Sequence, residues 1–131
     1  MKKNKISKNW INRQRRDIYV RKSKIEGYRS RAVYKLEEIN KKFKIFHNGV
    51  SVLDLGAAPG SWTQYISKNY KNIKLASIDI KKFDEVENTF QITGDFKEDI
   101  YKQKILNFFQ GKIDIIISDM AGNTTGNKIL D

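Results

Sequence analysis

The sequence of 131 residues predicts an α/β fold: a parallel sheet of about four strands with connecting helices, preceded by a basic helical arm. The first observation is a strand–turn–helix unit, in which the apolar run 51–55 leads through a loop of small residues into a helical segment at 62–70. The second is a series of further short apolar runs, at 73–79, 90–92 and 113–117. The third is an acidic residue in or just after each run, where open α/β sheets bind their ligands.

The loop 56–60 is built for close contact with a ligand. Gly56 and Gly60 permit positive φ and a close approach of the backbone to a bound group. The helix that begins near Gly60 directs unpaired amides and its positive dipole end toward the same place. We therefore expect a nucleotide-like or carboxylate-bearing ligand. The spacing is not G-x-G-x-x-G, which disfavours a NAD-binding domain.

The later elements continue the pattern. The runs 73–79 and 90–92 are predicted as the second and third strands. Residues 97–109 are predicted as a helix closed by Gly111. Its expected inward side chains are Ile100, Ile105, Leu106 and Phe109.

The last apolar run, 113–117, is predicted as a fourth strand. Its continuous apolar composition is typical of a strand covered on both faces inside a parallel sheet. Such a strand needs neighbours on both sides, and little sequence follows it. We therefore expect the chain to be the amino-terminal part of a larger fold, in a truncated or split form.

The front of the chain is strongly basic. The net charge is +11, and residues 1–46 hold 16 Lys and Arg against 4 Asp and Glu. We interpret residues 1–29 as an RNA-binding arm, because excess charge confined to one segment favours a polyanionic partner. Aromatic side chains suited to base stacking are interleaved with the charges: Trp10, Tyr19 and Tyr28. The alternative is a basic tail that serves only solubility.

Two helices are expected before the first strand. Residues 1–6 are predicted to be disordered, and Ser7 is a candidate cap for a basic helix that Gly27 interrupts. Ser30 is predicted to cap a second helix, 31–43. Its core-facing stripe is expected to contain Val33, Leu36, Ile39 or Asn40, and Phe43. Lys35 lies off that stripe.

Composition excludes several classes of site. The chain has no cysteine and a single histidine, His47, so disulfides, thiolate or histidine metal sites and a histidine-based triad are not expected. No apolar run approaches the ~20 residues that span a bilayer, and the amino terminus lacks a signal-peptide core. The expected location is cytoplasmic.

Four acids are expected at the carboxyl edge of the sheet: Asp54, Asp79, Asp95 and Asp119. Asp79 follows Gly60 by 19 residues, near the ~20-residue spacing at which an acid binds ribose hydroxyls. Asp95 is a candidate acceptor for an adenine amino group, or else a cap for the helix at 97–109. Asp54 is expected to be structural. Trp62 is either a wall of the pocket or part of the core.

The segment 54–62, Asp-Leu-Gly-Ala-Ala-Pro-Gly-Ser-Trp, resembles the S-adenosylmethionine loop of the FtsJ-type ribosomal RNA 2′-O-methyltransferases. Three further segments resemble motifs of that family in the same order. They are Ser-Arg-Ala-Val-Tyr-Lys-Leu-Glu-Glu-Ile at 30–39, Gly-Asp-Phe at 94–96 and Ser-Asp-Met-Ala at 118–121. The resemblance extends from about residue 9 to the end.

The resemblance implies an incomplete Rossmann-like, S-adenosylmethionine-dependent methyltransferase domain at 30–131. It implies methylation of a uridine 2′-hydroxyl in large-subunit ribosomal RNA, with that RNA or the large ribosomal subunit as partner. It assigns S-adenosyl-L-methionine binding to Gly60, Trp62, Asp79, Asp95 and Asp119. Of the family's catalytic Lys-Asp-Lys-Glu set, the first two members match Lys35 and Asp119.

The chain departs from the family pattern at several points. Ser61 and Gly122 stand where glycine and proline are usual, and the later catalytic lysine and glutamate would lie beyond residue 131. Lys128 comes too early to replace that lysine. A separate carboxyl-terminal fragment is therefore an expected partner if the enzyme is divided. The alternative is a non-catalytic RNA-binding remnant that uses the basic arm.

Overall fold

The computed structural model describes residues 2–119. The motif residues at 120–122 and Lys128 lie outside this range. The elements, in order, are α1 (Lys2–Glu26), α2 (Val33–Phe43), β1 (Ser51–Leu55), α3 (Ser61–Asn69), β2 (Lys74–Asp79), β3 (Phe90–Thr93), α4 (Asp99–Phe109) and β4 (Ile115–Ser118).

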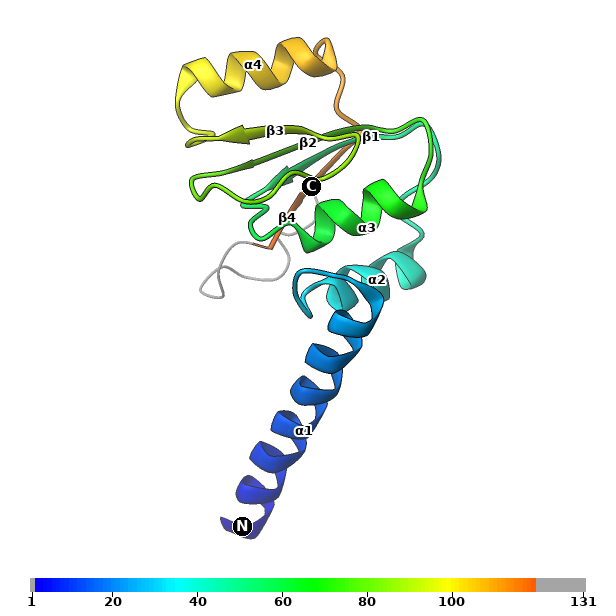
Figure 1. Cartoon of the computed structure of the whole chain (residues 1–131), viewed down its shortest axis with the longest axis vertical. Helices are drawn as coiled ribbons and strands as arrows, with labels where there is room; N and C mark the ends of the chain where they lie inside the picture. Colours follow the sequence, from blue (N-terminus) through cyan, green and yellow to red (C-terminus); the bar gives the residue numbers. More distant parts are fainter. Residues whose placement is uncertain (1, 120–131) are drawn as a thin grey trace.

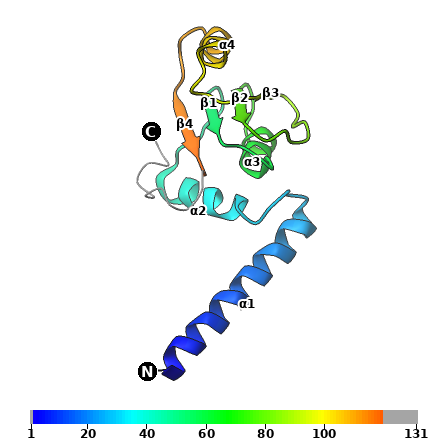
Figure 2. The same ribbon diagram turned by 90° about the vertical axis from the view of Figure 1, so that its left-hand side faces the viewer.

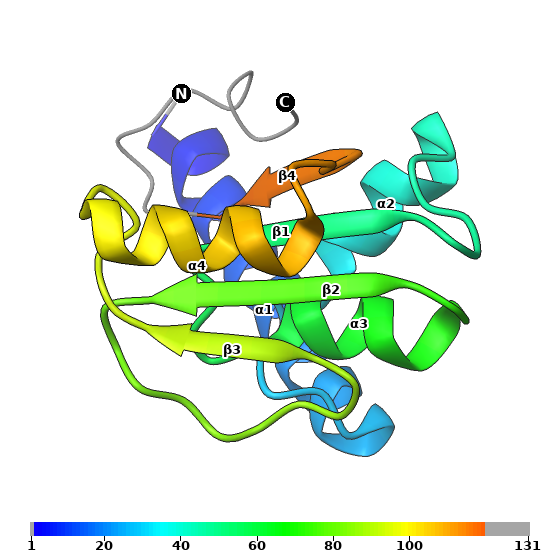
Figure 3. The ribbon, with the colours of Figure 1, turned by 90° about the horizontal axis from the view of Figure 1, so that it is seen from above.

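The strands form one parallel sheet in the order β3-β2-β1-β4. All the strands therefore end at the same edge, and Figure 3 shows β2, β3 and β4 pointing the same way. β1 lies between β2 and β4, so the loop that follows it is flanked by the ends of both neighbours. The predicted α/β fold with a parallel sheet is confirmed.

Helices cover both faces of the sheet. α4 lies on one face, α2 and α3 lie on the other, and α1 extends away from the sheet (Figures 1 and 2). Each face has its own hydrophobic cluster. The cluster toward α2 and α3 includes Val33, Leu36, Val52, Ile66, Leu75 and Ile117. The cluster toward α4 includes Leu53, Ala76, Ile78, Ile92, Ile105 and Phe109.

β4 contacts both clusters, as its apolar composition predicts. Ile115 and Ile117 belong with the cluster toward α2 and α3, whereas Ile116 packs against the cluster toward α4. Successive side chains of a strand point to opposite faces, which explains why every isoleucine is needed. Within residues 2–119, β4 pairs only with β1.

Two of the four side chains that were predicted to face inward from α4 are exposed. Ile105 and Phe109 are buried as expected, but Ile100 is 60% exposed and Leu106 is 47% exposed. The sheet selects a neighbouring stripe that adds Tyr101 and Phe108, both partly buried in the cluster toward α4. Phe108 stacks on Phe90 of β3 with ring centroids 4.7 Å apart.

The helices before the sheet also differ from expectation. α1 begins at Lys2, where disorder was predicted, and ends before Gly27, whose φ is +82°. α2 begins at Val33 with Ala32 as its N-cap residue. Ser30 therefore does not cap the helix; its Oγ lies 2.8 Å from Ser61 Oγ at the start of α3.

The core-facing stripe of α2 ends on a polar side chain. Phe43 is 62% exposed, contrary to the predicted stripe, whereas Asn40, predicted as the alternative to Ile39, is buried. Asn40 Oδ1 accepts hydrogen bonds at 3.1 Å from the amides of Ile45 and Phe46, which satisfies backbone groups just beyond the helix end.

Candidate functional site

The loop after β1 is fastened to the end of β2. The amides of Gly56 and Ala57 donate to the carbonyl of Ile78 at 2.8 and 3.2 Å. The amide of Ala58 donates to Asp79 Oδ2 at 2.8 Å. Gly56 has a φ of +68°, a left-handed value that glycine adopts without steric cost. The carboxylate of Asp79 thus shapes the loop directly.

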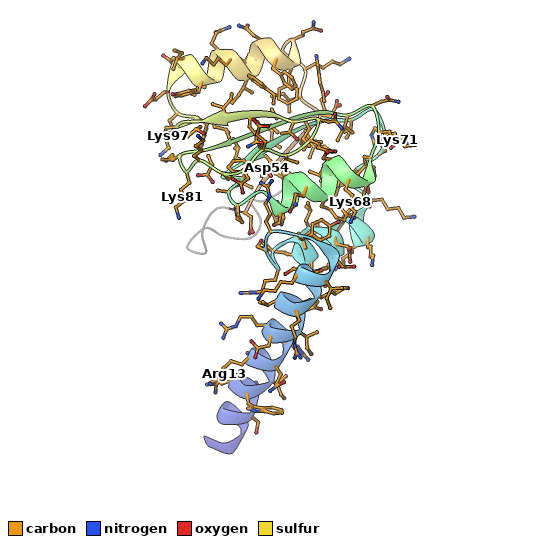
Figure 4. The ribbon with its side chains drawn as sticks, viewed as in Figure 1. Arg13, Asp54, Lys68, Lys71, Lys81 and Lys97 are labelled. Atoms are coloured by element: carbon orange, nitrogen blue, oxygen red, sulfur yellow. The ribbon has the colours of Figure 1, made fainter. Side chains whose placement is uncertain are left out.

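A cavity of about 530 Å³ opens at this edge of the sheet. Three of the predicted acids line it together: Asp79, Asp95 and Asp119. The rest of the wall comes from the loop after β1, the end of β2 and the turn after β3. Those residues are Gly56, Ala58, Ile78, Ile80, Gly94, Phe96 and Lys97. Figure 4 places Lys81 and Lys97 at this same end of the sheet.

Asp95 belongs to the cavity and does not cap α4. The N-cap residue of α4 is Glu98, while Asp95 Oδ1 accepts from the amide of Lys97 at 2.9 Å. That bond orders the turn after β3, and Asp95 also lines the cavity wall. The alternative that made Asp95 a helix cap is wrong.

Asp119 stands between two cavities. Lys35 Nζ of α2 lies 3.4 Å from Asp119 Oδ1, and both side chains are partly exposed. Asp119 also lines a second cavity of about 560 Å³, together with Tyr19 of α1 and residues 30–38. The residues of that second segment are Ser30, Arg31, Ala32, Tyr34, Lys35 and Glu38. The first cavity is lined by three carboxylates and one ammonium group, whereas the second is lined by two cationic side chains and two carboxylates.

Two predicted cofactor residues lie outside the acidic cavity. Gly60 is the N-cap residue of α3, with a φ of +106°, and a Cβ built there would lie 2.7 Å from Arg29 Nη1. Trp62 is 3% exposed in the cluster toward α2 and α3. Its indole Nε1 donates to the carbonyl of Ala32 at 2.7 Å. Neither residue lines the cavity, and Trp62 packs in the core; the cofactor roles of Gly60 and Trp62 stay predictions.

Asp54 is a buried carboxyl beneath the site. It is 1% exposed and accepts a hydrogen bond from Thr63 Oγ1 at 2.7 Å; Figure 4 marks it between the sheet and α3. Burial raises the pKa of Asp54 to about 7, the Thr63 hydrogen bond lowers it in part, and the charges of Asp119 and Asp79 raise it further. Asp54 therefore supports the loop from below, as its predicted structural role requires.

Comparison with known proteins decides the family. The model of the FtsJ-like methyltransferase family matches residues 28–131, which is most of the chain. The chain belongs to the FtsJ-like methyltransferases. The fold is accordingly that of an incomplete Rossmann-like methyltransferase.

Two curated relatives match the chain over its whole length. It is 60% identical over 131 residues to ribosomal RNA large subunit methyltransferase E of Pelagibacter ubique (strain HTCC1062), covering all of this chain and 64% of the relative. It is 45% identical over 133 residues to the protein of the same name from Legionella pneumophila (strain Corby), covering 65% of that relative. The chain thus spans just under two thirds of the length of these curated relatives.

A solved structure supports the same fold. A crystal structure described as that of a ribosomal RNA methyltransferase from Plasmodium falciparum matches with a TM-score of 0.64 and 40% identity, covering 77% of this chain and 60% of that chain. None of the helices within residues 2–119 combines the length and the hydropathy that a membrane-spanning segment requires.

The sequence did not indicate two further residues at the candidate site, Tyr19 and Arg29. Tyr19 was identified as a stacking surface, but nothing in its spacing placed it beside Lys35 and Asp119. Arg29 was counted only as one charge of the arm, yet it contacts the loop that follows β1. Its position directly after the Gly27 break was the available signal.

Proposed function

We propose that this chain binds S-adenosyl-L-methionine and takes part in methylating a uridine 2′-hydroxyl in large-subunit ribosomal RNA. The observation that carries the proposal is the pair of cavities that share Asp119. One cavity has the carboxylates that could accept hydrogen bonds from an adenosyl group. The other has Arg31 and Lys35, which could contact a phosphate, beside the carboxylates of Glu38 and Asp119. A methyl donor and its acceptor would meet at the shared carboxylate.

The residues of the acidic cavity suit the cofactor. Carboxylates accept hydrogen bonds, and the adenosyl group offers ribose hydroxyls and an adenine amino group as donors. Asp79 is the candidate for the ribose hydroxyls and Asp95 for the amino group, with Phe96 beside it as apolar wall. Asp119 is near enough to the junction to offset the positive charge of a sulfonium. When bound, the cofactor supplies an already activated methyl group.

In this proposal Gly60 and Trp62 support the cofactor without touching it. Gly60 starts α3 directly after the loop, and Trp62 anchors the first turn of α3 to Ala32. Both residues therefore hold the amides of the loop in place for the ligand.

The second cavity is the candidate acceptor site. Arg31 and Lys35 would neutralise a backbone phosphate and orient the nucleotide, since cations on one wall favour a polyanion. Lys35 also holds Asp119 through their ion pair at 3.4 Å. Asp119 would accept a hydrogen bond from the 2′-hydroxyl and align its oxygen with the methyl group, which is the main catalytic requirement for an activated donor.

The reaction forms an oxygen–carbon bond, breaks a carbon–sulfur bond and releases the proton of the hydroxyl. The family resemblance assigns the base that takes this proton to a lysine beyond residue 131. Lys35 and Asp119 are therefore proposed as positioning members of the catalytic set. Full activity would require the segment that the longer relatives possess.

The arm at 1–29 is proposed to deliver the RNA to residues 30–131. α1 carries Arg13, Arg15, Arg16 and Arg21, and Figure 4 shows Arg13 on its outer part. A cationic helix beside the second cavity would hold the RNA by its phosphates, which contribute affinity without sequence selection. Selection of the uridine would then fall to the cavity.

The decisive experiment measures methyl transfer from labelled S-adenosylmethionine to large-subunit ribosomal RNA. It is run with the chain alone and with the chain plus the remaining segment of the Pelagibacter ubique relative. A labelled methyl group on an RNA 2′-oxygen, found only when the remaining segment is added, would support a divided enzyme. Absence of transfer in both arms, together with no cofactor binding by calorimetry, would refute the proposal.

A second candidate function is RNA binding without catalysis, favoured by the concentration of charge in α1. It predicts RNA affinity that falls steeply with salt and is the same with and without S-adenosylmethionine. Cofactor binding with a dissociation constant in the range of other methyltransferases would exclude this candidate.

A further inference from the structure

The connection between α1 and α2 contains a side chain that joins three distant segments. Arg29 Nη1 donates to the carbonyl of Pro59 at 2.9 Å and to the carbonyl of Asp84 at 2.6 Å. Its Nη2 donates to the carbonyl of Glu85 at 2.6 Å. One guanidinium therefore bridges the base of α1, the loop after β1 and the connection between β2 and β3.

The acceptors of this guanidinium are all main-chain carbonyls. Among the described residues, Arg29 makes no ion pair with a carboxylate, so its charge is held by oriented peptide dipoles. A planar fork with several donors can serve carbonyls on two segments at once, which an ammonium group does less well. The side chain is thus matched to its position by geometry more than by charge.

Gly60 is complementary to Arg29. A Cβ at position 60 would come within 2.7 Å of Arg29 Nη1 and within 3.3 Å of the Phe83 ring. The φ of +106° is a second reason for glycine at this position. The loop after β1 therefore leaves room for the guanidinium as well as for its own turn.

The backbone around Arg29 is held to α3. The Arg29 amide donates to Gln64 Oε1 at 2.9 Å, and Gln64 Nε2 donates to the carbonyl of Gly27 at 3.4 Å. The Lys68 ammonium lies 5.1 Å from the centre of the Tyr28 ring. The segment that follows α1 is therefore held in a fixed position against α3.

We propose that Arg29 is a positioning residue that sets the loop after β1 for the cofactor and orients α1 with the same side chain. Pro59, which it contacts, adjoins Ala58, and Ala58 both lines the acidic cavity and donates to Asp79. Arg29 itself does not line that cavity. The effect of Arg29 on cofactor binding rests on the proposed function. Its role in holding the loop and α1 in place does not.

The test compares Arg29→Ala with Lys102→Ala in the full chain. Both variants lose one positive charge, and Lys102 is exposed on α4 and lines neither cavity. Titration calorimetry with S-adenosylhomocysteine, the demethylated cofactor, is expected to show about tenfold weaker binding for Arg29→Ala, since several charge-assisted hydrogen bonds are lost. Lys102→Ala is expected to stay within twofold of the parent chain.

Rescue separates positioning from general damage. Guanidinium chloride, at a concentration well below denaturing, is expected to restore the affinity of Arg29→Ala, and the same concentration of sodium chloride is not. Equal affinity of both variants and the parent chain would overturn the inference. Loss of affinity that guanidinium fails to restore would also overturn it, because it would indicate a disrupted fold.

A readout without ligand keeps this inference distinct from the proposed function. Hydrogen exchange of peptides covering residues 80–87 and 56–60 is expected to be faster in Arg29→Ala and unchanged in Lys102→Ala. If the parent chain binds no cofactor, the proposed function fails. Faster exchange in Arg29→Ala would still support the role of Arg29 in joining α1, the loop after β1 and the connection between β2 and β3. Unchanged exchange in Arg29→Ala would overturn the inference whatever the cofactor result.

Discussion

The buried carboxyl of Asp54 makes the stability of the fold depend on pH in an unusual direction. Asp54 is 1% exposed, and its pKa rises from the ordinary 3.8 to about 7 in the folded chain, chiefly through burial. Between these values the folded state holds a proton that the unfolded state has released. The free energy of unfolding therefore falls as pH rises through this window, by up to about 1.4 kcal/mol per pH unit.

Asp54→Asn removes this dependence while keeping the shape of the side chain. The asparagine oxygen can still accept from Thr63. Its amide gains a candidate acceptor in Ser77 Oγ, which lies opposite in the β1–β2 register and is buried with no hydrogen-bond partner among residues 2–119. The difference in unfolding free energy between variant and parent is expected to grow by about 2.5 kcal/mol from pH 5 to pH 8. Above the pKa of Asp54 the difference should level off.

Urea unfolding at a series of pH values, followed by circular dichroism, measures this difference. Subtracting the two curves cancels the titration of groups common to both proteins. Thr63→Val supplies a second test: loss of its hydrogen bond should raise the pKa of Asp54 further and extend the falling region to higher pH. Parallel curves for Asp54→Asn and the parent between pH 5 and pH 8 would show that the carboxyl is not protonated in the fold.

Three further outcomes are expected. Asp79→Asn should weaken S-adenosylhomocysteine binding at least tenfold by calorimetry, because one carboxylate oxygen holds the loop amide and the group lines the cavity. Trp62→Phe should lower the unfolding free energy by about 1–3 kcal/mol in urea, because the buried hydrogen bond to the carbonyl of Ala32 is lost. Ile105→Ala should cost about 2–5 kcal/mol, whereas Leu106→Ala should change stability by less than about 0.5 kcal/mol, since only Ile105 is buried.

Each of these outcomes has a clear contradiction. Unchanged affinity in Asp79→Asn would remove this acid from the cofactor site. A large loss of cofactor affinity in Trp62→Phe, with stability unchanged, would indicate that the Trp62 indole contacts the cofactor. Equal costs at positions 105 and 106 would mean that α4 packs with a different face toward the sheet.

The sequence alone determined the architecture and the edge at which the site forms. Short apolar runs joined by helical segments predict a parallel sheet, and parallel strands end at one edge. Asp79, Asp95 and Asp119 follow their strands closely, so their convergence on one cavity required no knowledge of side-chain packing. The packing of β4 against both hydrophobic clusters was also predictable from its unbroken isoleucines, although only Ile117 is fully buried within residues 2–119.

Tertiary structure decided which residues of the loop region face a ligand and which face the core. Trp62 and Gly60 share a motif with the cavity residues, but the helical turn of α3 directs Trp62 against α2. The phase of α4 was ambiguous because two overlapping stripes of apolar residues fit a helix, and contact with Phe90 selected one of them. Local periodicity cannot choose between such stripes.

The pairing of Lys35 with Asp119, and the bridge made by Arg29, depend on segments far apart in the chain. These contacts join residues 84 positions apart in one case and 30 to 56 positions apart in the other. These contacts form only in the folded sheet. There the order β3-β2-β1-β4 places β4 beside β1, and α2 lies on the same face of the sheet as α3. Composition marks such residues merely as charged and exposed, because a side chain's partners follow from the path of the whole backbone.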